Sequence, residues 1–188
     1  MRTWTSSLSV PTSARRGIVA AVAVALTLPA CAGLSSSLGG GEPVAVDIPS
    51  IGDEVDELGA ALVTIEADDG SSVQLAARVA DDRAARRQGL MGVRELPDDV
   101  GMLFTWDGGE REGGFWMRDT LIPLDIAFVS ADGRIEAVLS MVPCTSDPCP
   151  SYDPGSPYVA ALEVPAGWFE ANGVEQGDRL SWVPATED

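Results

Sequence analysis

The chain has no histidine and no lysine, and these two absences restrict the chemistry that it can perform. All twelve of its basic residues are arginine. Without histidine, it lacks both the side chain that titrates nearest to neutral pH and the commonest metal ligand in proteins. Nucleophiles activated by a neighbouring histidine and Schiff bases on lysine are therefore excluded within this chain. Catalysis would depend on carboxylates, on Tyr152 or Tyr158, or on a cofactor supplied from outside.

Positive charge is scarce as well. The chain has 12 basic and 29 acidic residues among 188, which gives a net charge of −17. A protein that binds nucleic acid through its phosphates needs a basic surface, so we exclude nucleic acid as a partner. The simplest interpretation of the acidic charge is a solvated surface that keeps an exported protein in solution.

The apolar run near the N-terminus is too short for a membrane-spanning helix. It covers residues 17–28, whereas a spanning helix needs about 20 residues. Arg2, Arg15 and Arg16 precede it without any acidic residue. A positive segment, a short apolar run and small residues in this order are typical of a secretory signal, so we predict a signal peptide over residues 1–30. Its removal would leave 29 acidic residues and 9 arginines, a net charge of −20.

The sequence LPAC at residues 28–31 resembles a bacterial lipobox. This resemblance implies that Cys31 carries a diacylglyceryl group on its sulfur and becomes the mature N-terminus. Two or three acyl chains would hold the protein stably on a membrane, because each buried CH2 contributes about 0.8 kcal/mol. We therefore expect a lipid-anchored protein at the outer face of the cytoplasmic membrane or in the periplasm. Ordinary cleavage that leaves Cys31 free, an uncleaved anchor, and export by the general or the twin-arginine route are the alternatives.

The composition changes twice along the rest of the chain. Residues 31–59 are rich in glycine, serine and acidic residues and poor in large apolar ones, so they are predicted to form a disordered tether. From residue 60 to residue 188 apolar and polar residues alternate in short stretches, which is typical of β-strands. We expect this part to form one domain, since about 125 residues suffice for a sizeable core.

The strands and helices of this domain are predicted from alternation and turn residues. Asp81 and Asp82 are candidate N-caps for a short helix that ends near Gly89 or Gly92, and a second short helix is expected over residues 168–172. Strands are expected at residues 61–67, 72–80, 121–129, 135–142, 158–164 and 178–183. The predicted fold is α+β and mostly antiparallel β, a compact, barrel-like single domain with one or two short helices.

Four segments of this domain carry a family resemblance. They are RQGLMG (87–92), GMLF (101–104), FWMRDTLIPLDIAF (115–128) and YVAALEVPAGWFEANGVEQGD (158–178). Together, and in this order, they resemble the domain-of-unknown-function 192 family, and the resemblance spans nearly all of residues 60–185. It implies a compact β-rich fold, often exported or lipid-anchored, and brings no agreed activity. Where this family usually has Lys-Asn after Trp-Met, the present chain has Arg118 and Asp119.

Asp125 is the first candidate for a functional residue, because it interrupts an apolar strand. A carboxylate among apolar neighbours costs several kcal/mol unless it is paired or hydrogen-bonded. It is either a structural residue, satisfied by Arg94, Arg118 or backbone N–H groups, or a pocket carboxylate with a raised pKa that serves as acid or base. Together with Trp116, Arg118 and Asp119, Asp125 forms our candidate ligand-binding set.

Cys144 and Cys149 lie in a proline-rich loop with the spacing C-x4-C. In an exported chain such a pair is expected to form a disulfide, and a metal site would need more ligands. No metal site and no cofactor are predicted. The glycines around residues 110–112 indicate either a flexible connection or a lid over a site beside Trp116 and Asp125.

Three functions are compatible with these observations. The first is a membrane-tethered, extracytoplasmic binding or accessory domain that presents an aromatic-lined cleft to a small molecule or to an envelope partner. The second is an envelope enzyme that uses Asp125, with Asp119, as general acid and base while Arg118 holds an anionic group of the substrate. The third is a purely structural lipoprotein.

Overall fold

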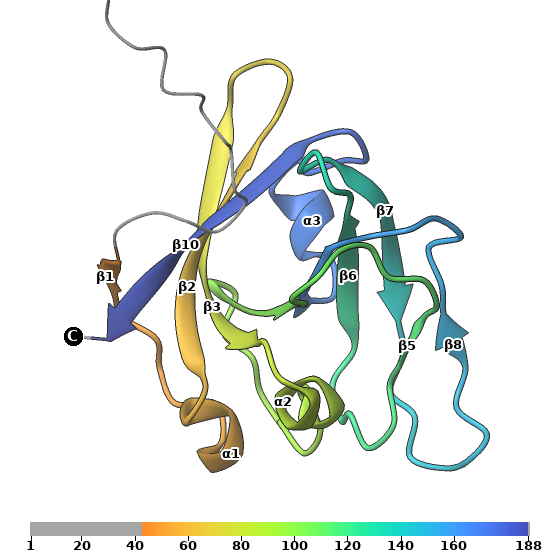
Figure 1. The fold of residues 1–188 in the computed structure, drawn as a ribbon. Helices are drawn as coiled ribbons and strands as arrows, with labels where there is room; N and C mark the ends of the chain where they lie inside the picture. The colour runs from red at the N-terminus through yellow and green to blue at the C-terminus, as the bar shows by residue number, and fades with distance from the viewer. Residues whose placement is uncertain (1–42, 188) are drawn as a thin grey trace, which may run out of the picture. The chain divides into compact units, whose positions relative to one another are not determined.

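The computed structural model describes residues 43–187, and their main element is a single curved sheet (Figure 1). Its strands are β1 (Val44–Val46), β2 (Gly59–Glu66), β3 (Ser72–Ala80), β4 (Val100–Thr105), β6 (Leu124–Val129), β7 (Ile135–Met141), β9 (Ala160–Pro165) and β10 (Arg179–Glu187). A separate two-stranded sheet pairs β5 (Phe115–Trp116) with β8 (Ser151–Tyr152). The helices are α1 (Asp53–Asp56), α2 (Arg83–Gln88) and α3 (Trp168–Ala171). The predicted signal peptide and Cys31 lie outside the described residues.

The sheet has the strand order β1-β10-β2-β3-β4-β9-β6-β7. Only β1 with β10 and β3 with β4 pair in parallel, so the prediction of a mostly antiparallel fold is confirmed. Within residues 43–187 the sheet does not close, because β1 and β7 remain its edges. An isolated bridge between Arg134 and Arg179 joins the start of β7 to the start of β10, so the term barrel-like describes the curvature only loosely.

The central strands are buried on both faces, which explains their nearly continuous apolar sequences. On β6, Leu124, Ile126 and Phe128 belong to one apolar cluster, and Ala127 and Val129 belong to the other. The first cluster is covered by α1, the segment around α2 and the segment that follows β5. The second cluster is covered by α3, whose Trp168 and Phe169 are buried.

The turn from β3 into α2 follows the predicted capping chemistry. The Asp82 carboxylate accepts hydrogen bonds from the backbone N–H groups of Ala84 and Ala85, at 2.6 and 2.8 Å. These donors, Ala85 first, hold the pKa of Asp82 below its usual value. Two N–H groups that the first turn of a helix leaves without partners are thereby satisfied.

Residues 43–59, which were predicted to belong to the disordered tether, contain β1 and α1 in the structure. Val46, Ile48, Ile51 and Val55 are buried in the first apolar cluster. β1 pairs with β10, at the opposite end of the sequence. Few apolar residues suffice here because the rest of the domain supplies the surface on which they are buried.

A buried arginine joins the two ends of the domain. The Arg78 side chain, on β3, is 1% exposed and forms an ion pair with Glu187 on β10. It also donates to the carbonyl oxygen of Leu58 at 3.3 Å and lies 3.7 Å from Asp56 on α1. Hydrogen bonds from Ser50 and Ile51 hold the pKa of Asp56 below its usual value, which favours the charged partner that Arg78 requires.

Among residues 43–187, no helix is both long enough and apolar enough to cross a membrane.

Candidate functional site

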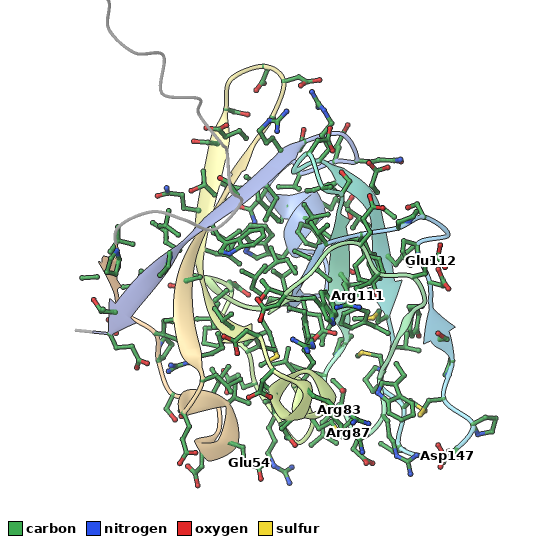
Figure 2. All side chains as sticks on the ribbon, viewed as in Figure 1. Glu54, Arg83, Arg87, Arg111, Glu112 and Asp147 are labelled. Carbon is green, nitrogen blue, oxygen red and sulfur yellow. A yellow bond between two sulfur atoms is a disulfide. The ribbon has the colours of Figure 1, made fainter. Side chains whose placement is uncertain are left out.

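Three of the predicted ligand-binding residues follow one another around a short strand. Trp116 lies on β5 and is 51% exposed. The Arg118 guanidinium lies over its ring, 5.8 Å from the centroid, and forms an ion pair with Asp147 at 3.1 Å. Figure 2 shows Asp147 on the loop that precedes β8. That loop contains the predicted disulfide, since Cys144 and Cys149 are bonded. Arg118 is therefore engaged by neighbouring groups.

Asp119 has an architectural role that its residue type explains. It has a φ of 54°, the left-handed conformation that aspartate and asparagine tolerate better than most residues. Its carbonyl oxygen accepts from Gly92 N–H, and its N–H donates to the Cys144 carbonyl oxygen. The backbone of Asp119 thus joins the segment after α2 to the disulfide loop.

Asp125 lies apart from these residues, on the face of β6 that carries Ala127. It is 5% exposed, and its Oδ2 accepts a hydrogen bond of 2.7 Å from the backbone N–H of Gly167. Its Oδ1 has no partner among the described residues. Of the donors considered from the sequence, a backbone N–H is the one that binds it. Since Gly167 has a φ of 85° and precedes α3, this carboxylate fixes the turn from β9 into α3.

A second carboxyl, Glu163, has fewer partners than Asp125. It lies on β9 between Met102 of β4 and Ile126 of β6, and it is 5% exposed. Burial alone raises its pKa from 4.5 to about 8, with no contribution from a hydrogen bond or from a neighbouring charge. The side chain is therefore mostly protonated at pH 7. Perturbed carboxyls of this kind are enriched at functional sites.

Glu163 borders a small cavity, which we call the Glu163 hollow. Its walls are the last three residues of α2, the segment after that helix, three aromatic residues and one threonine: Arg86, Arg87, Gln88, Gly89, Leu90, Met91, Phe104, Phe115, Trp116 and Thr120. Its volume is about 30 Å³, so the cavity is small but large enough for water. Figure 2 shows Arg87 on α2.

The Glu163 hollow gathers residues from all four segments that carry the family resemblance. Met91 comes from the first segment, Phe104 from the second, Trp116 and Thr120 from the third, and Glu163 from the fourth. These segments are far apart in sequence, and the pairing of β9 with β4 and β6 brings them together. The sequence reasoning overlooked Glu163, although it interrupts the apolar stretch AALEVP as Asp125 interrupts LDIAF.

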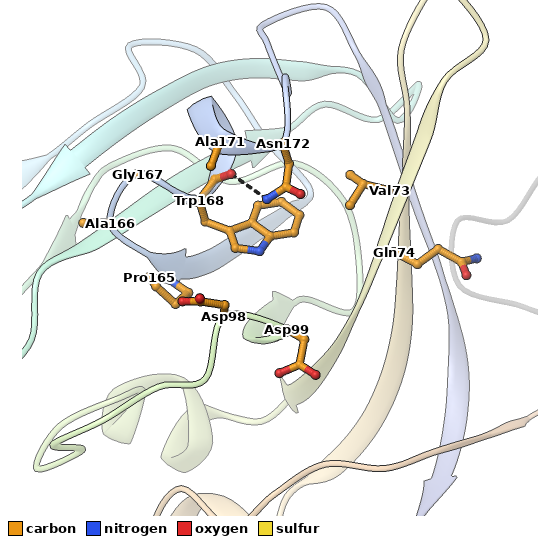
Figure 3. Close-up of a pocket in the computed structure, with 10 residues that line it drawn as sticks. All are labelled: Val73, Gln74, Asp98, Asp99, Pro165, Ala166, Gly167, Trp168, Ala171 and Asn172. Atoms are coloured by element: carbon orange, nitrogen blue, oxygen red, sulfur yellow. Dashed lines mark hydrogen bonds between the residues drawn. The ribbon is translucent and has the colours of Figure 1, made fainter.

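A larger groove of about 520 Å³ lies on the α3 side (Figure 3). We call it the α3 groove; it is lined by Val73, Gln74, Asp98, Asp99, Pro165, Ala166, Gly167, Trp168, Ala171 and Asn172. The Asn172 amide donates to the Trp168 carbonyl oxygen at 2.9 Å. Asp125 supports this groove, because its carboxylate accepts a hydrogen bond from the backbone N–H of Gly167, which lines the groove. Its carboxylates, Asp98 and Asp99, are exposed to solvent, unlike Glu163.

The four residues predicted to bind a ligand therefore do not form one site. Trp116 borders the Glu163 hollow, whereas Arg118 and Asp119 line a separate cavity of about 90 Å³ beside the disulfide loop. Asp125 lies behind the α3 groove. In residues 43–187, no cluster of three acidic or cysteine side chains is arranged to hold a metal ion.

Comparison with known proteins finds relatives without an established activity. The family model described as an uncharacterized conserved region, DUF192, matches residues 64–182. A solved protein of unknown function from Novosphingobium aromaticivorans is 30% identical, with a TM-score of 0.62 over 76% of this chain and all of the other. A proposed transcription regulator from Sinorhizobium meliloti is 33% identical, with a TM-score of 0.61 over 66% of this chain and 95% of the other. No curated protein matches the chain.

Proposed function

We propose that this chain, which belongs to the domain-of-unknown-function 192 family, is a membrane-tethered extracytoplasmic domain that binds a small ligand in the Glu163 hollow. The observation that carries the proposal is the Glu163 carboxyl, which is 5% exposed, borders a cavity and receives no hydrogen bond from the described residues. A polar group buried without a partner costs stability, so a ligand that supplies the partner would recover part of that cost.

The position of the aromatic residues also supports a binding site. Trp116 is one of the few large apolar side chains that remain exposed among the described residues, and it lies at the rim of the Glu163 hollow. Ligand sites are commonly lined by aromatic side chains together with a few polar groups. Asp125 is not needed for this function, because its hydrogen bond to Gly167 gives it a structural role.

The role proposed for the Sinorhizobium protein does not fit the charge of this chain. Binding to DNA gains most of its affinity from phosphate contacts, which require clustered positive charge. The present chain has a net charge of −17. An acidic domain of this kind would be repelled by the nucleic acid backbone.

Ligand binding can be tested by a thermal-shift screen of small cations, anions and neutral polar compounds on the purified full chain. Amide NMR then locates each hit. We expect the amides of Leu90, Thr120 and Glu163 to shift, while those of Asp99 and Gly167 stay unchanged. Hits that shift only Asp99 and Gly167 would assign binding to the α3 groove instead, and a screen without hits would contradict ligand binding.

The membrane tether is tested separately, in cells that express the full chain. We expect labelled palmitate to be incorporated into the wild-type protein and not into Cys31→Ala, because the lipobox cysteine is the acceptor. The wild-type protein should sediment with membranes. An unlabelled wild-type protein in the cytosolic fraction would overturn the predicted location and leave the ligand site untouched.

A further inference from the structure

We propose that the Glu163 hollow binds the tip of a primary ammonium group and that Glu163 gives up a proton when this cation enters. The inference rests on the proposed function, because it names the ligand class of the same site. The step is balanced: the neutral Glu163 carboxyl and a primary ammonium ion become a Glu163 carboxylate paired with the same ammonium ion, and one proton is released to solvent.

The carboxyl at the base of the hollow favours a cation. Glu163 is 5% exposed and receives no hydrogen bond from the described residues. An ammonium group would donate up to three hydrogen bonds, and the Thr120 hydroxyl, which also borders the cavity, could accept one of them.

The aromatic walls favour a cation for a second reason. Phe104, Phe115 and Trp116 line the cavity, and the π faces of such rings attract positive charge. The same protein already places cations on tryptophan rings. The guanidinium of Arg86 lies 5.4 Å from the Trp106 centroid, and that of Arg118 lies 5.8 Å from the Trp116 centroid.

Two arginines line the hollow, but their charges do not reach its base. Arg86 directs its guanidinium to the carbonyl oxygens of Asp81 and Thr105. Arg87 is exposed on the outer side of α2.

The small size of the cavity and the negative charge of the whole chain are both compatible with a small cation as the ligand. A cavity of this small size admits a primary ammonium tip. The net charge of −17 raises the local concentration of cations around the protein.

Proton release follows from the surroundings of Glu163. With a pKa of about 8, it is roughly nine-tenths protonated at pH 7. The charged side chains that line the same cavity are Arg86 and Arg87 of α2.

The test is isothermal titration calorimetry of the purified full chain with n-butylammonium, n-butanol and butyrate, in buffers of different ionisation enthalpy. We expect butylammonium to bind with release of about 0.9 proton at pH 7, and with about tenfold weaker affinity at pH 6. Butanol and butyrate should not bind. Nα-acetyl-lysine amide, whose side-chain ammonium group is free, tests whether a protein side chain can supply the same group. If this compound binds and butylammonium does not, the natural ligand is a protein lysine rather than a free amine.

Two variants keep the result decisive. Glu163→Gln copies the shape of the protonated acid, so it should fold, and it should weaken butylammonium at least tenfold and abolish proton release. Glu66→Gln, an exposed strand position, should change neither. Binding of butanol or butyrate at the hollow, or of butylammonium without proton release, would overturn the ammonium class while the proposed function stands. If no compound of any class shifts the hollow amides, both fail.

Discussion

Asp125 and Glu163 are acidic residues in neighbouring buried strands, and their partners make them different. Both are 5% exposed. Asp125 accepts a hydrogen bond from Gly167 N–H, which allows it to remain part of the scaffold. Glu163 points to the opposite face of the sheet, into the Glu163 hollow, where no described residue donates a hydrogen bond to it. The burial of Glu163 therefore costs stability when it is ionised.

Replacement of this carboxyl should produce a pH-dependent gain in stability. Between its unfolded pKa near 4.5 and its folded pKa of about 8, Glu163 binds more protons in the folded state. The contribution of Glu163 to the free energy of unfolding of the wild type is therefore fully present below pH 4.5 and is lost as the pH rises to 8. We expect the free energy of unfolding of Glu163→Gln to exceed that of wild type by an amount that grows about 1.4 kcal/mol per pH unit in this window.

Urea unfolding of both proteins at pH 5, 6.5 and 8 measures the difference. Because all other acids are common to the two proteins, their contributions cancel. Glu66→Gln serves as the exposed control and should follow wild type at every pH. Parallel curves for Glu163→Gln and wild type would show that Glu163 titrates normally.

At the scale of elements, the close approach of β4 and β9 positions Glu163. Gly101, in β4, has no side chain at the point where the strands converge. A Cβ placed there would lie 2.8 Å from the Glu163 carbonyl oxygen and 3.1 Å from Leu75. Such a distance is shorter than ordinary van der Waals contact, so backbone would have to move.

Gly101→Ala should therefore destabilise the domain by about 1–3 kcal/mol through overpacking. Equilibrium unfolding in urea provides the measurement. Gly59→Ala is the matched control, because a Cβ at Gly59 meets nothing within 4 Å; its effect should stay within about 0.5 kcal/mol. Equal effects of the two substitutions would mean that the strands can separate without cost.

At the scale of the whole domain, the segment before β2 completes the fold. Val46, Ile48, Ile51 and Val55 are buried against the first apolar cluster. The same segment supplies Asp56, which lies 3.7 Å from the buried guanidinium of Arg78. Its removal would expose apolar surface and leave a buried charge with fewer partners.

A chain that begins at residue 60 should accordingly be much less stable than one that begins at residue 43. Each fully buried apolar side chain contributes about 1.5–3 kcal/mol, only partly offset by the entropy of ordering the segment. We expect a loss of several kcal/mol, a large share of the stability of an ordinary domain. Thermal unfolding followed by circular dichroism measures it, and coinciding transitions would show that residues 43–59 are dispensable.

Some features of this protein follow from local sequence alone. The Asp82 cap depends on residues within one turn, and the β2–β3 hairpin depends on alternation around Asp68, Asp69 and Gly70. The Cys144–Cys149 bond joins residues five positions apart. Family membership also required only four segments in order. Each is determined by neighbours in the chain, which the sequence displays directly.

Other features depend on partners that are distant in sequence. β1 is a strand because it pairs with β10. The segment that contains it has few apolar residues among many acidic ones, so its burial could not be predicted from composition. Asp125 and Glu163 interrupt apolar strands in the same way, and only the strand pairing and the placement of Gly167 decide which of them is satisfied. Burial and hydrogen bonding are properties of the surroundings, so the tertiary structure, rather than the residue type, selected Glu163.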